Sequence, residues 1–162
     1  MDILWQELSF GIADQRDLAK IIIRLIASFI LGGIIGFERE MFGKPAGLRT
    51  HILVSLGTTV FVLGCIGAGM GFDAQSRVIQ GIVTGIGFIG AGSILKLETQ
   101  NNIKGLTTAA GIWMTSAIGV VVGLGELGLA IIATILTVIV LAVISTIEFR
   151  AENKKTKEET HE

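Results

Sequence analysis

The residues best suited to chemistry gather at the ends of long apolar stretches. Carboxylates such as Glu38, Glu40 and Glu98 can bind Mg²⁺, a cation that takes oxygen ligands, or they can pair with neighbouring arginines and lysines. We favour ion pairs over a metal site, and we expect the functional site at this polar rim. The rim comprises Glu38, Arg39, Glu40, Arg49, Thr50, His51, Glu98, Lys104, Thr107 and Thr108.

Three of these residues are threonines that stand where apolar helices are expected to begin. The hydroxyls of Thr50, Thr107 and Thr108 can cap helix N-termini, whose free N–H groups and dipole attract anions. His51 is a single imidazole and is weak evidence for a metal. The chain shows no set of nucleophile, base and orienting group, so the sequence predicts a protein that is not an enzyme.

Polar side chains inside the apolar stretches are a second group of interest. Arg24 can bind an anion or a lipid headgroup, but we favour a side chain that snorkels outward or hydrogen-bonds to Gln80 at a similar depth. No Asp or Glu lies away from the ends of these stretches, which disfavours a proton pump or a cation-coupled transporter. The intramembrane polar group comprises Arg24, Gln80, Thr84 and Ser93.

Five stretches approach the roughly 20 apolar residues that cross a bilayer. Of the 162 residues 51% are hydrophobic and 17% are charged, which is too little charge to cover a soluble domain. The net charge of −1 excludes a basic nucleic-acid-binding protein. The sequence therefore predicts an all-α, polytopic transmembrane bundle of about five helices in a lipid bilayer. The five stretches are Leu18–Phe37, Ile52–Gly71, Val78–Leu95, Leu106–Leu124 and Leu127–Ile147.

Lysine and arginine are distributed unevenly between the two sides of this bundle, which predicts its orientation. Nine of them fall in the first connection, the third connection and the tail, and three fall on the opposite side. We therefore expect the amphipathic N-terminal segment 1–17 outside the cell. The transmembrane domain covers 18–147, and the charged tail 148–162 is expected in the cytoplasm.

The chain has 22 glycines, several at the four-residue spacing that lets helix backbones approach closely in lipid. We expect close packing within the bundle and self-association, with a dimer favoured. The alternative is a broken helix over Gly85–Gly92 that lines a polar cavity, with Thr84 and Ser93 at its ends. The glycines concerned are Gly32, Gly36, Gly81, Gly85, Gly87, Gly90, Gly92, Gly119 and Gly123.

An internal repeat is indicated when the chain is shifted by 58 residues. Gly47-Leu48-Arg49-Thr50 then aligns with Gly105-Leu106-Thr107-Thr108, and Gly32 aligns with Gly90. The two copies would form parallel hairpins related by an axis along the membrane normal.

Several motifs resemble those of the MgtC/SapB family of bacterial membrane proteins. They occur over about residues 18–145, in the order and at the spacing of that family. The motifs are GGIIGFERE (32–40), AGLRTH (46–51), Arg77-Val78, GIGFIGAG (85–92), GLTTAA (105–110) and Trp113.

The resemblance implies a five-helix domain of the bacterial inner membrane. It also implies roles in growth at low magnesium, in survival inside host cells during virulence, and in control of membrane potential through ATP synthase as a partner. We expect a regulator in magnesium homeostasis that carries no cofactor. The alternative is a transporter or channel that passes Mg²⁺ or a small solute between the two repeats.

Two departures from the family pattern limit what the resemblance implies. Longer members carry a soluble cytoplasmic domain after the fifth helix, whereas this chain is expected to end in a charged tail, so activities that need that domain are in doubt. Many members also place a glutamine four residues before the glycine-rich run. Here that position is Gly81, and Gln80 precedes it, so we expect a rearranged polar contact.

Overall fold

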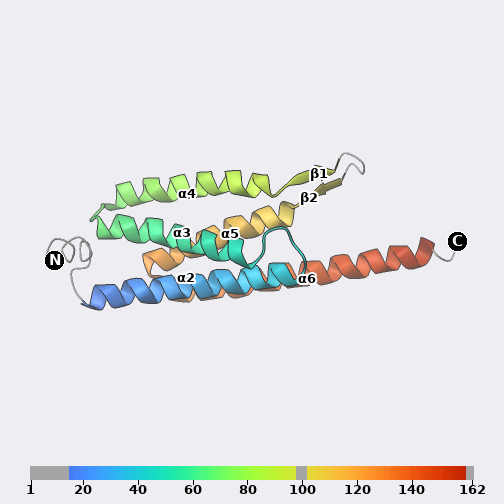
Figure 1. Ribbon diagram of the computed structural model, residues 1–162, viewed down its shortest axis with the longest axis horizontal. Coiled ribbons are helices and arrows are strands. Elements are labelled where there is room, and N and C mark those ends of the chain that lie inside the picture. Colours follow the sequence, from blue (N-terminus) through green and yellow to red (C-terminus); the bar gives the residue numbers. More distant parts are fainter. Residues whose placement is uncertain (1–14, 98–101, 160–162) are drawn as a thin grey trace.

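The computed structural model describes residues 15–97 and 102–159, and this part of the chain forms five helices and one short hairpin of strands (Figure 1). The prediction of an all-α helical bundle is confirmed. Most of the predicted N-terminal segment 1–17 lies outside the described residues. The elements are α2 (Gln15–Met41), α3 (Leu48–Gly67), α4 (Phe72–Gly92), β1 (Leu95–Leu97), β2 (Asn102–Lys104), α5 (Leu106–Leu124) and α6 (Leu127–Glu159).

The helices follow the five apolar stretches with shifted ends. Helices α2, α3 and α5 are long and apolar enough to cross a membrane, and α6 contains a shorter apolar part at Leu127–Val143. Helix α4 begins six residues before the predicted stretch, with Asp73 in its first turn, where a carboxylate favours the positive end of the helix dipole. A five-span topology therefore stays a prediction for α4 and α6.

Two differences from the prediction concern the cytoplasmic connections and the tail. Leu95, predicted as the end of a helix, lies in β1, which pairs antiparallel with β2. Helix α6 continues to Glu159, so most of the predicted charged tail is helical.

The helices alternate in direction along the bundle. In Figure 1, α2, α4 and α6 run one way, while α3 and α5 run the other, so the end of α2 and the beginnings of α3 and α5 share one end of the molecule. Arg39, Arg49 and Lys104 belong to this end. The arrangement agrees with the expected gathering of basic residues on one side of the membrane.

Two apolar clusters hold the bundle together. The larger one joins α6 to α2 and α5, and the smaller one attaches α4 through Ile86, which packs with Ile112 and Ala46. Many large apolar side chains point outward instead, among them Phe29, Phe61 and Phe88. Outward apolar side chains around a helical bundle fit an environment of lipid rather than water.

Glycines bring α2, α3 and α5 into close contact. A Cβ added at Gly32 would lie 2.8 Å from the His51 carbonyl oxygen, and one at Gly36 would lie 2.7 Å from Leu48 Cα. These distances fall below ordinary contact, so the backbones can only approach this closely where a side chain is absent. The packing expected of these glycines is therefore present, and it is repeated on α5, at Gly119 and Gly123 against α3.

The glycines of α4 behave differently from those of α2 and α5. A Cβ added at Gly81, Gly85, Gly87 or Gly92 would meet no heavy atom within 4 Å. The expectation that Gly81 and Gly85 pack helices within the chain is therefore wrong. The alternative of a broken helix is also wrong, because α4 runs without interruption through Gly92.

The predicted 58-residue repeat has a counterpart in the packing. Gly32 of α2 meets His51 of α3, and Gly90 of α4 meets Ala109 of α5, each contact being displaced by 58 residues from the other. Helices α3 and α5 also begin 58 residues apart, at Leu48 and Leu106. The two hairpins therefore share one packing register.

Candidate functional site

The most unusual group of residues is an ion pair buried where α2 ends. Arg39 Nη1 lies 3.4 Å from Glu38 Oε2, and the two residues are 1% and 8% exposed. This contact is long and uses a single donor of the guanidinium. Arg39 Nε, Arg39 Nη2 and Glu38 Oε1 are buried without a hydrogen-bond partner. Buried charges with so few partners are costly, which marks this place as more than a packing contact.

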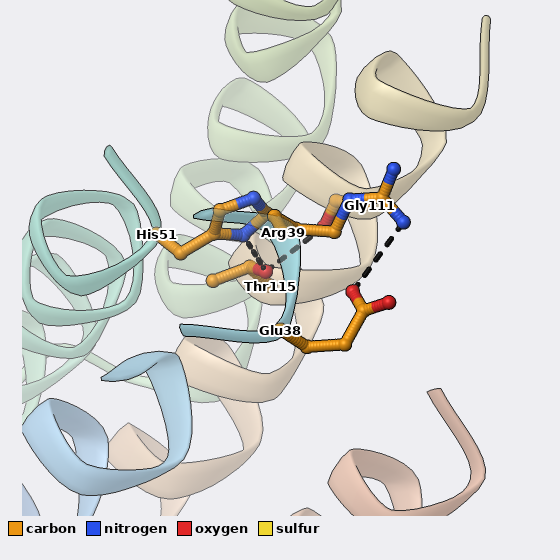
Figure 2. Close-up of polar contacts among 5 residues, drawn as sticks. All are labelled: Glu38, Arg39, His51, Gly111 and Thr115. Atoms are coloured by element: carbon orange, nitrogen blue, oxygen red, sulfur yellow. Dashed lines mark hydrogen bonds and ion pairs between the residues drawn. The ribbon is translucent and has the colours of Figure 1, made fainter. Parts of the chain in front are cut away.

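His51 lies beside this pair and is held by α5 (Figure 2). Its Nδ1 is 2.7 Å from Thr115 Oγ1, and the Thr115 hydroxyl donates to the Gly111 carbonyl oxygen at 2.8 Å. The single hydroxyl proton of Thr115 can go either to the Gly111 carbonyl or to His51 Nδ1, so the tautomer of His51 sets the direction of this contact. His51 Nε2 is buried and makes no hydrogen bond of good geometry.

Hydroxyl groups extend this polar contact toward the other end of the bundle. Ser28 Oγ lies 2.9 Å from Ser55 Oγ and 2.9 Å from Thr59 Oγ1. Thr59 Oγ1 also lies 2.8 Å from the Gly119 carbonyl oxygen, and Arg24 donates to the Gly123 carbonyl at 2.8 Å. We call this row the polar seam. It comprises Glu38, Arg39, His51, Thr115, Ser55, Ser28 and Thr59.

The contact of Arg24 differs from the expectation. Its partner is Gly123, in the last turn of α5, rather than Gln80, which is exposed on α4. A cation beside the last carbonyls of a helix satisfies them and complements the negative end of the dipole. Thr84 and Ser93, also singled out from the sequence, donate to carbonyls of their own helix, at Gln80 and Gly90.

The predicted rim is divided by the structure into a buried and an exposed part. The buried part holds Glu38, Arg39, His51 and Thr108, while Thr50 is half-buried. The exposed part comprises Glu40, Arg49, Lys104 and Thr107, and Glu98 lies outside the described residues.

The predicted threonine caps are wrong. The N-cap residues of α3 and α5 are Gly47 and Gly105, neither of which can offer a side chain, so Thr50 and the equivalent Thr108 lie inside the first turn. At α3 a carboxylate takes the role instead, because the Leu48 N–H donates to Glu40 Oε2 at 2.9 Å. An acidic group at this end of a helix is favourable.

The two candidate carboxylates that the structure describes, Glu38 and Glu40, do not gather as a metal site would require. Glu38 faces Arg39, and Glu40 accepts from the backbone of α3. In the part of the chain that the structure describes, no three residues of the types His, Cys, Asp and Glu lie together as a group able to hold a metal ion.

A second feature is an apolar groove between α3 and α4. It encloses about 590 Å³, and Thr58 is the one polar side chain among its lining residues. Gly57, Gly81 and Gly85 lie in this lining, and a Cβ added to any of them would meet nothing within 4 Å. The groove can therefore accept another apolar segment close to the backbones of α3 and α4.

Sequence reasoning missed the hydroxyl residues of the polar seam. Ser28, Ser55, Thr59 and Thr115 are all buried, and each hydrogen-bonds to a neighbouring helix. A signal was present, because His51, Ser55 and Thr59 recur every four residues and therefore share one face of α3. Polar residues at this spacing inside an apolar stretch indicate a helix face turned toward other helices.

Comparisons with known proteins agree with this architecture. Residues 25–150 match the MgtC family. The chain is 46% identical over 144 residues to the putative magnesium transporter YhiD of Escherichia coli. This match covers 84% of the chain and 66% of the length of YhiD. It is 39% identical over 139 residues to protein SrpB of Synechococcus elongatus, covering 79% and 76% of the two chains.

A further relative is protein MgtC of Brucella abortus, 40% identical over 140 residues. That match covers 84% of this chain and 58% of the relative, so the chain spans only about three fifths of that protein's length. No solved structure matches the chain. The family match extends over most of the helical bundle, including the polar seam and the groove. The chain therefore belongs to the MgtC family.

Proposed function

We propose that this chain is a non-enzymatic regulator in the bacterial inner membrane that acts in adaptation to low magnesium. The observation that carries the proposal is the apolar groove between α3 and α4, which offers a binding surface for an apolar partner. A hydrated Mg²⁺ requires oxygen ligands and keeps much of its water. The groove lining suits instead a transmembrane helix of a partner protein, brought close by the glycines.

The packing of α2, α3 and α5 supports a binding role over transport. Gly32 and Gly36 bring the backbone of α2 against α3, and the hydroxyls of Ser28, Ser55 and Thr59 bond to one another. Hydroxyls engaged in this way act as contacts between helices. A conducting route through these three helices would have to break those contacts.

The link to magnesium is supported by the names of the relatives. The E. coli relative is named a putative magnesium transporter, and other relatives carry the name MgtC. We propose two partners. One is ATP synthase, which the family resemblance implies, and the other is a second copy of this chain. Gly119 and Gly123 are already covered by α3, so we propose that a dimer would use the open glycines of α4.

The orientation that we propose places the N-terminus outside and the C-terminus in the cytoplasm. It is supported by the position of Arg39, Arg49 and Lys104 at one end of the bundle. Cysteine accessibility at an added N-terminal cysteine and at Lys104→Cys, in intact cells and in opened membranes, tests this orientation. Both sites accessible in intact cells would contradict it.

The proposed regulatory function is tested by flux and growth together. Purified chain in liposomes is expected to leave the Mg²⁺ influx at the level of protein-free liposomes. In a strain whose growth at low magnesium depends on this chain, Gly85→Leu is expected to abolish growth by filling the groove. Gly87→Leu is the matched control, because Gly87 is equally open on the same helix but lies outside the groove lining.

A transporter is the second candidate, favoured by the name of the E. coli relative. It predicts a saturable Mg²⁺ influx in the liposome experiment. That influx would be unaffected by Gly85→Leu if the groove played no part. Such a result would replace the regulatory proposal.

A further inference from the structure

One face of α3 carries the apolar groove and, at its beginning, an exposed cation. Leu53, Gly57 and Phe61 line the groove and recur every four residues, so they share this face. Arg49 precedes Leu53 by four residues and continues the same row. It is exposed, and within the described part of the chain it forms no ion pair. The groove therefore has an uncompensated positive charge at the end where α3 begins.

The charge of Arg49 lies beyond the groove rather than inside it. Side chains on a helix lean toward its N-terminus, so Arg49 extends past the start of α3. His51 faces α5, and Arg49 stands two residues earlier, about 200° around the helix, so Arg49 points away from the polar seam. Glu40 accepts from the Leu48 N–H and forms no ion pair with Arg49. The guanidinium thus stays open to another anion.

The lining of the groove suits hydrocarbon along its whole length. The hydroxyl of Thr58, its one polar side chain, donates toward carbonyl oxygens of its own helix, at Val54 and Ser55, 3.0 Å away. Leu53 and Phe61 are 69% and 61% exposed, so the groove is open on its outer side, toward lipid if α3 crosses the membrane. A polar group of the occupant can be satisfied only at the end where Arg49 lies. The occupant is therefore an amphiphile with its charge at one end.

The length of the groove matches one leaflet of a bilayer. Its lining on α4 extends from Val78 to Ile89, which at the rise of an α-helix is about 17 Å. On α3, the distance along the axis from Arg49 to Phe61 is about 18 Å. The hydrocarbon core of a bilayer is about 30 Å thick, so one leaflet contributes about 15 Å. An acyl chain whose phosphate lies at Arg49 would therefore extend along the groove.

We infer that the groove binds one anionic phospholipid, with an acyl chain along the lining and the headgroup phosphate at Arg49. The cavity of about 590 Å³ has the size of a small-molecule site. A partner helix would match the apolar lining but would leave the cation at its end without a role. The inference rests on the proposed function, because it uses the same groove, and it adds the regulation of that groove. A partner helix must displace the lipid before it can bind.

The experiment uses the full chain purified in detergent and two phospholipids with identical acyl chains that carry a photoreactive diazirine. Phosphatidylglycerol is anionic, and phosphatidylcholine is zwitterionic. After irradiation, mass spectrometry maps the labelled residues. Phosphatidylglycerol is expected to label Leu53–Phe61 and Val78–Ile89 in a saturable manner. Its half-saturating concentration is expected to be about fivefold lower than that of phosphatidylcholine, the factor that one cation contributes near an anionic headgroup.

Four variants test the two ends of the lipid separately. Arg49→Gln is expected to remove the preference for phosphatidylglycerol, whereas Arg49→Lys keeps the charge and most of the preference. Arg16→Gln is the matched control, because it removes one exposed cation at the opposite end of the bundle. Gly85→Leu fills the groove and is expected to abolish the labelling by both lipids, while Gly87→Leu, outside the lining, leaves it unchanged.

The inference is overturned by labelling spread evenly over the outward faces of all helices, which would indicate bulk lipid around the bundle. Equal half-saturation for the two lipids, or an equal loss in Arg49→Gln and Arg16→Gln, would also overturn it. An unlabelled groove in a dimeric preparation would assign the groove to a second copy of the chain. If Gly85→Leu does not fold, the comparison of Arg49→Gln with Arg16→Gln still decides.

The lipid inference and the proposed function fail separately. A groove that takes up no label removes the lipid and leaves the partner helix, whose test is the loss of growth with Gly85→Leu. Normal growth of that variant would instead remove the partner helix from the groove, and the labelling of the unmodified chain would still report on the lipid.

Discussion

The two hairpins α2–α3 and α4–α5 share a packing register but differ in how closely their helices approach at the equivalent glycines. In the first, a Cβ on Gly32 would lie 2.8 Å from the His51 carbonyl oxygen, whereas in the second a Cβ on Gly90 would lie 3.6 Å from Ala109. The first hairpin is therefore packed backbone to backbone. The second is held at ordinary van der Waals distance.

The polar groups follow the same division. Ser28, His51 and Ser55 of the first hairpin are replaced, 58 residues later, by Ile86, Ala109 and Trp113. Hydrogen bonds require close and fixed geometry, which the glycines of α2 supply, while apolar contacts tolerate a wider spacing. One hairpin thus carries a rigid polar interior and the other leaves α4 with an open face.

The largest effect is expected from removing the charge of Arg39. Arg39→Leu leaves Glu38 buried without its cation and is expected to destabilise the fold by about 3–5 kcal/mol. Unfolding of the purified chain in mixed micelles of increasing SDS content measures the change.

A compensating variant sharpens this prediction. Glu38→Met combined with Arg39→Leu removes both charges and is expected to recover most of the lost stability, because an apolar pair of similar volume replaces the ion pair. A loss below about 1 kcal/mol for Arg39→Leu alone would contradict the burial of this pair.

The next effect is a difference between equivalent glycines. Gly32→Ala forces a Cβ against the backbone of α3 and is expected to cost about 1–3 kcal/mol. Gly90→Ala meets Ala109 at an ordinary distance, and it gains up to about 1 kcal/mol of helix propensity, so it is expected to be neutral or stabilising. SDS unfolding of the two variants in parallel makes the comparison. Equal losses would show that the hairpins are packed alike.

The helices could be predicted from the sequence, because an apolar stretch of about 20 residues has few alternatives to a membrane-spanning helix. The strands β1 and β2 could not, since three-residue strands with charged neighbours carry no periodic signal. The spacing of the glycines was visible, but Gly81 and Gly85 have the same pattern as Gly119 and Gly123. Only the position of the neighbouring helix decides which pair is covered.

The rim predicted from the sequence and the buried group around Arg39 share one end of the bundle but differ in depth. Glu38 and Arg39 follow an apolar stretch, which in sequence reads as the edge of the membrane. Their burial depends on helices distant in the sequence that pack against α2. The bond of His51 to Thr115 joins residues 64 positions apart, so no local pattern could indicate it.

A smaller effect is expected for a single hydroxyl of the polar seam. Ser28→Ala removes contacts to Ser55 and Thr59 and is expected to cost about 0.6 kcal/mol, the average for a hydrogen bond between membrane helices, and at most about 1.7 kcal/mol. Thr84→Ala is the matched control, since Thr84 is exposed and bonds only to its own helix. SDS unfolding measures both. If the two variants lose the same stability, the seam contributes nothing beyond helix propensity.

The smallest effect is expected at Arg49, which the sequence placed beside Arg39 in one functional rim. Arg49 is exposed in the first turn of α3, where a cation faces the positive end of the helix dipole and gains nothing from it. Arg49→Ala is therefore expected to change stability by at most about 0.5 kcal/mol and to leave growth at low magnesium intact. Unfolding in micelles and the growth assay measure the two quantities. Loss of growth with normal expression and stability would mean that a partner contacts this exposed arginine, and the functional surface would then extend from the interior of the first hairpin to the rim.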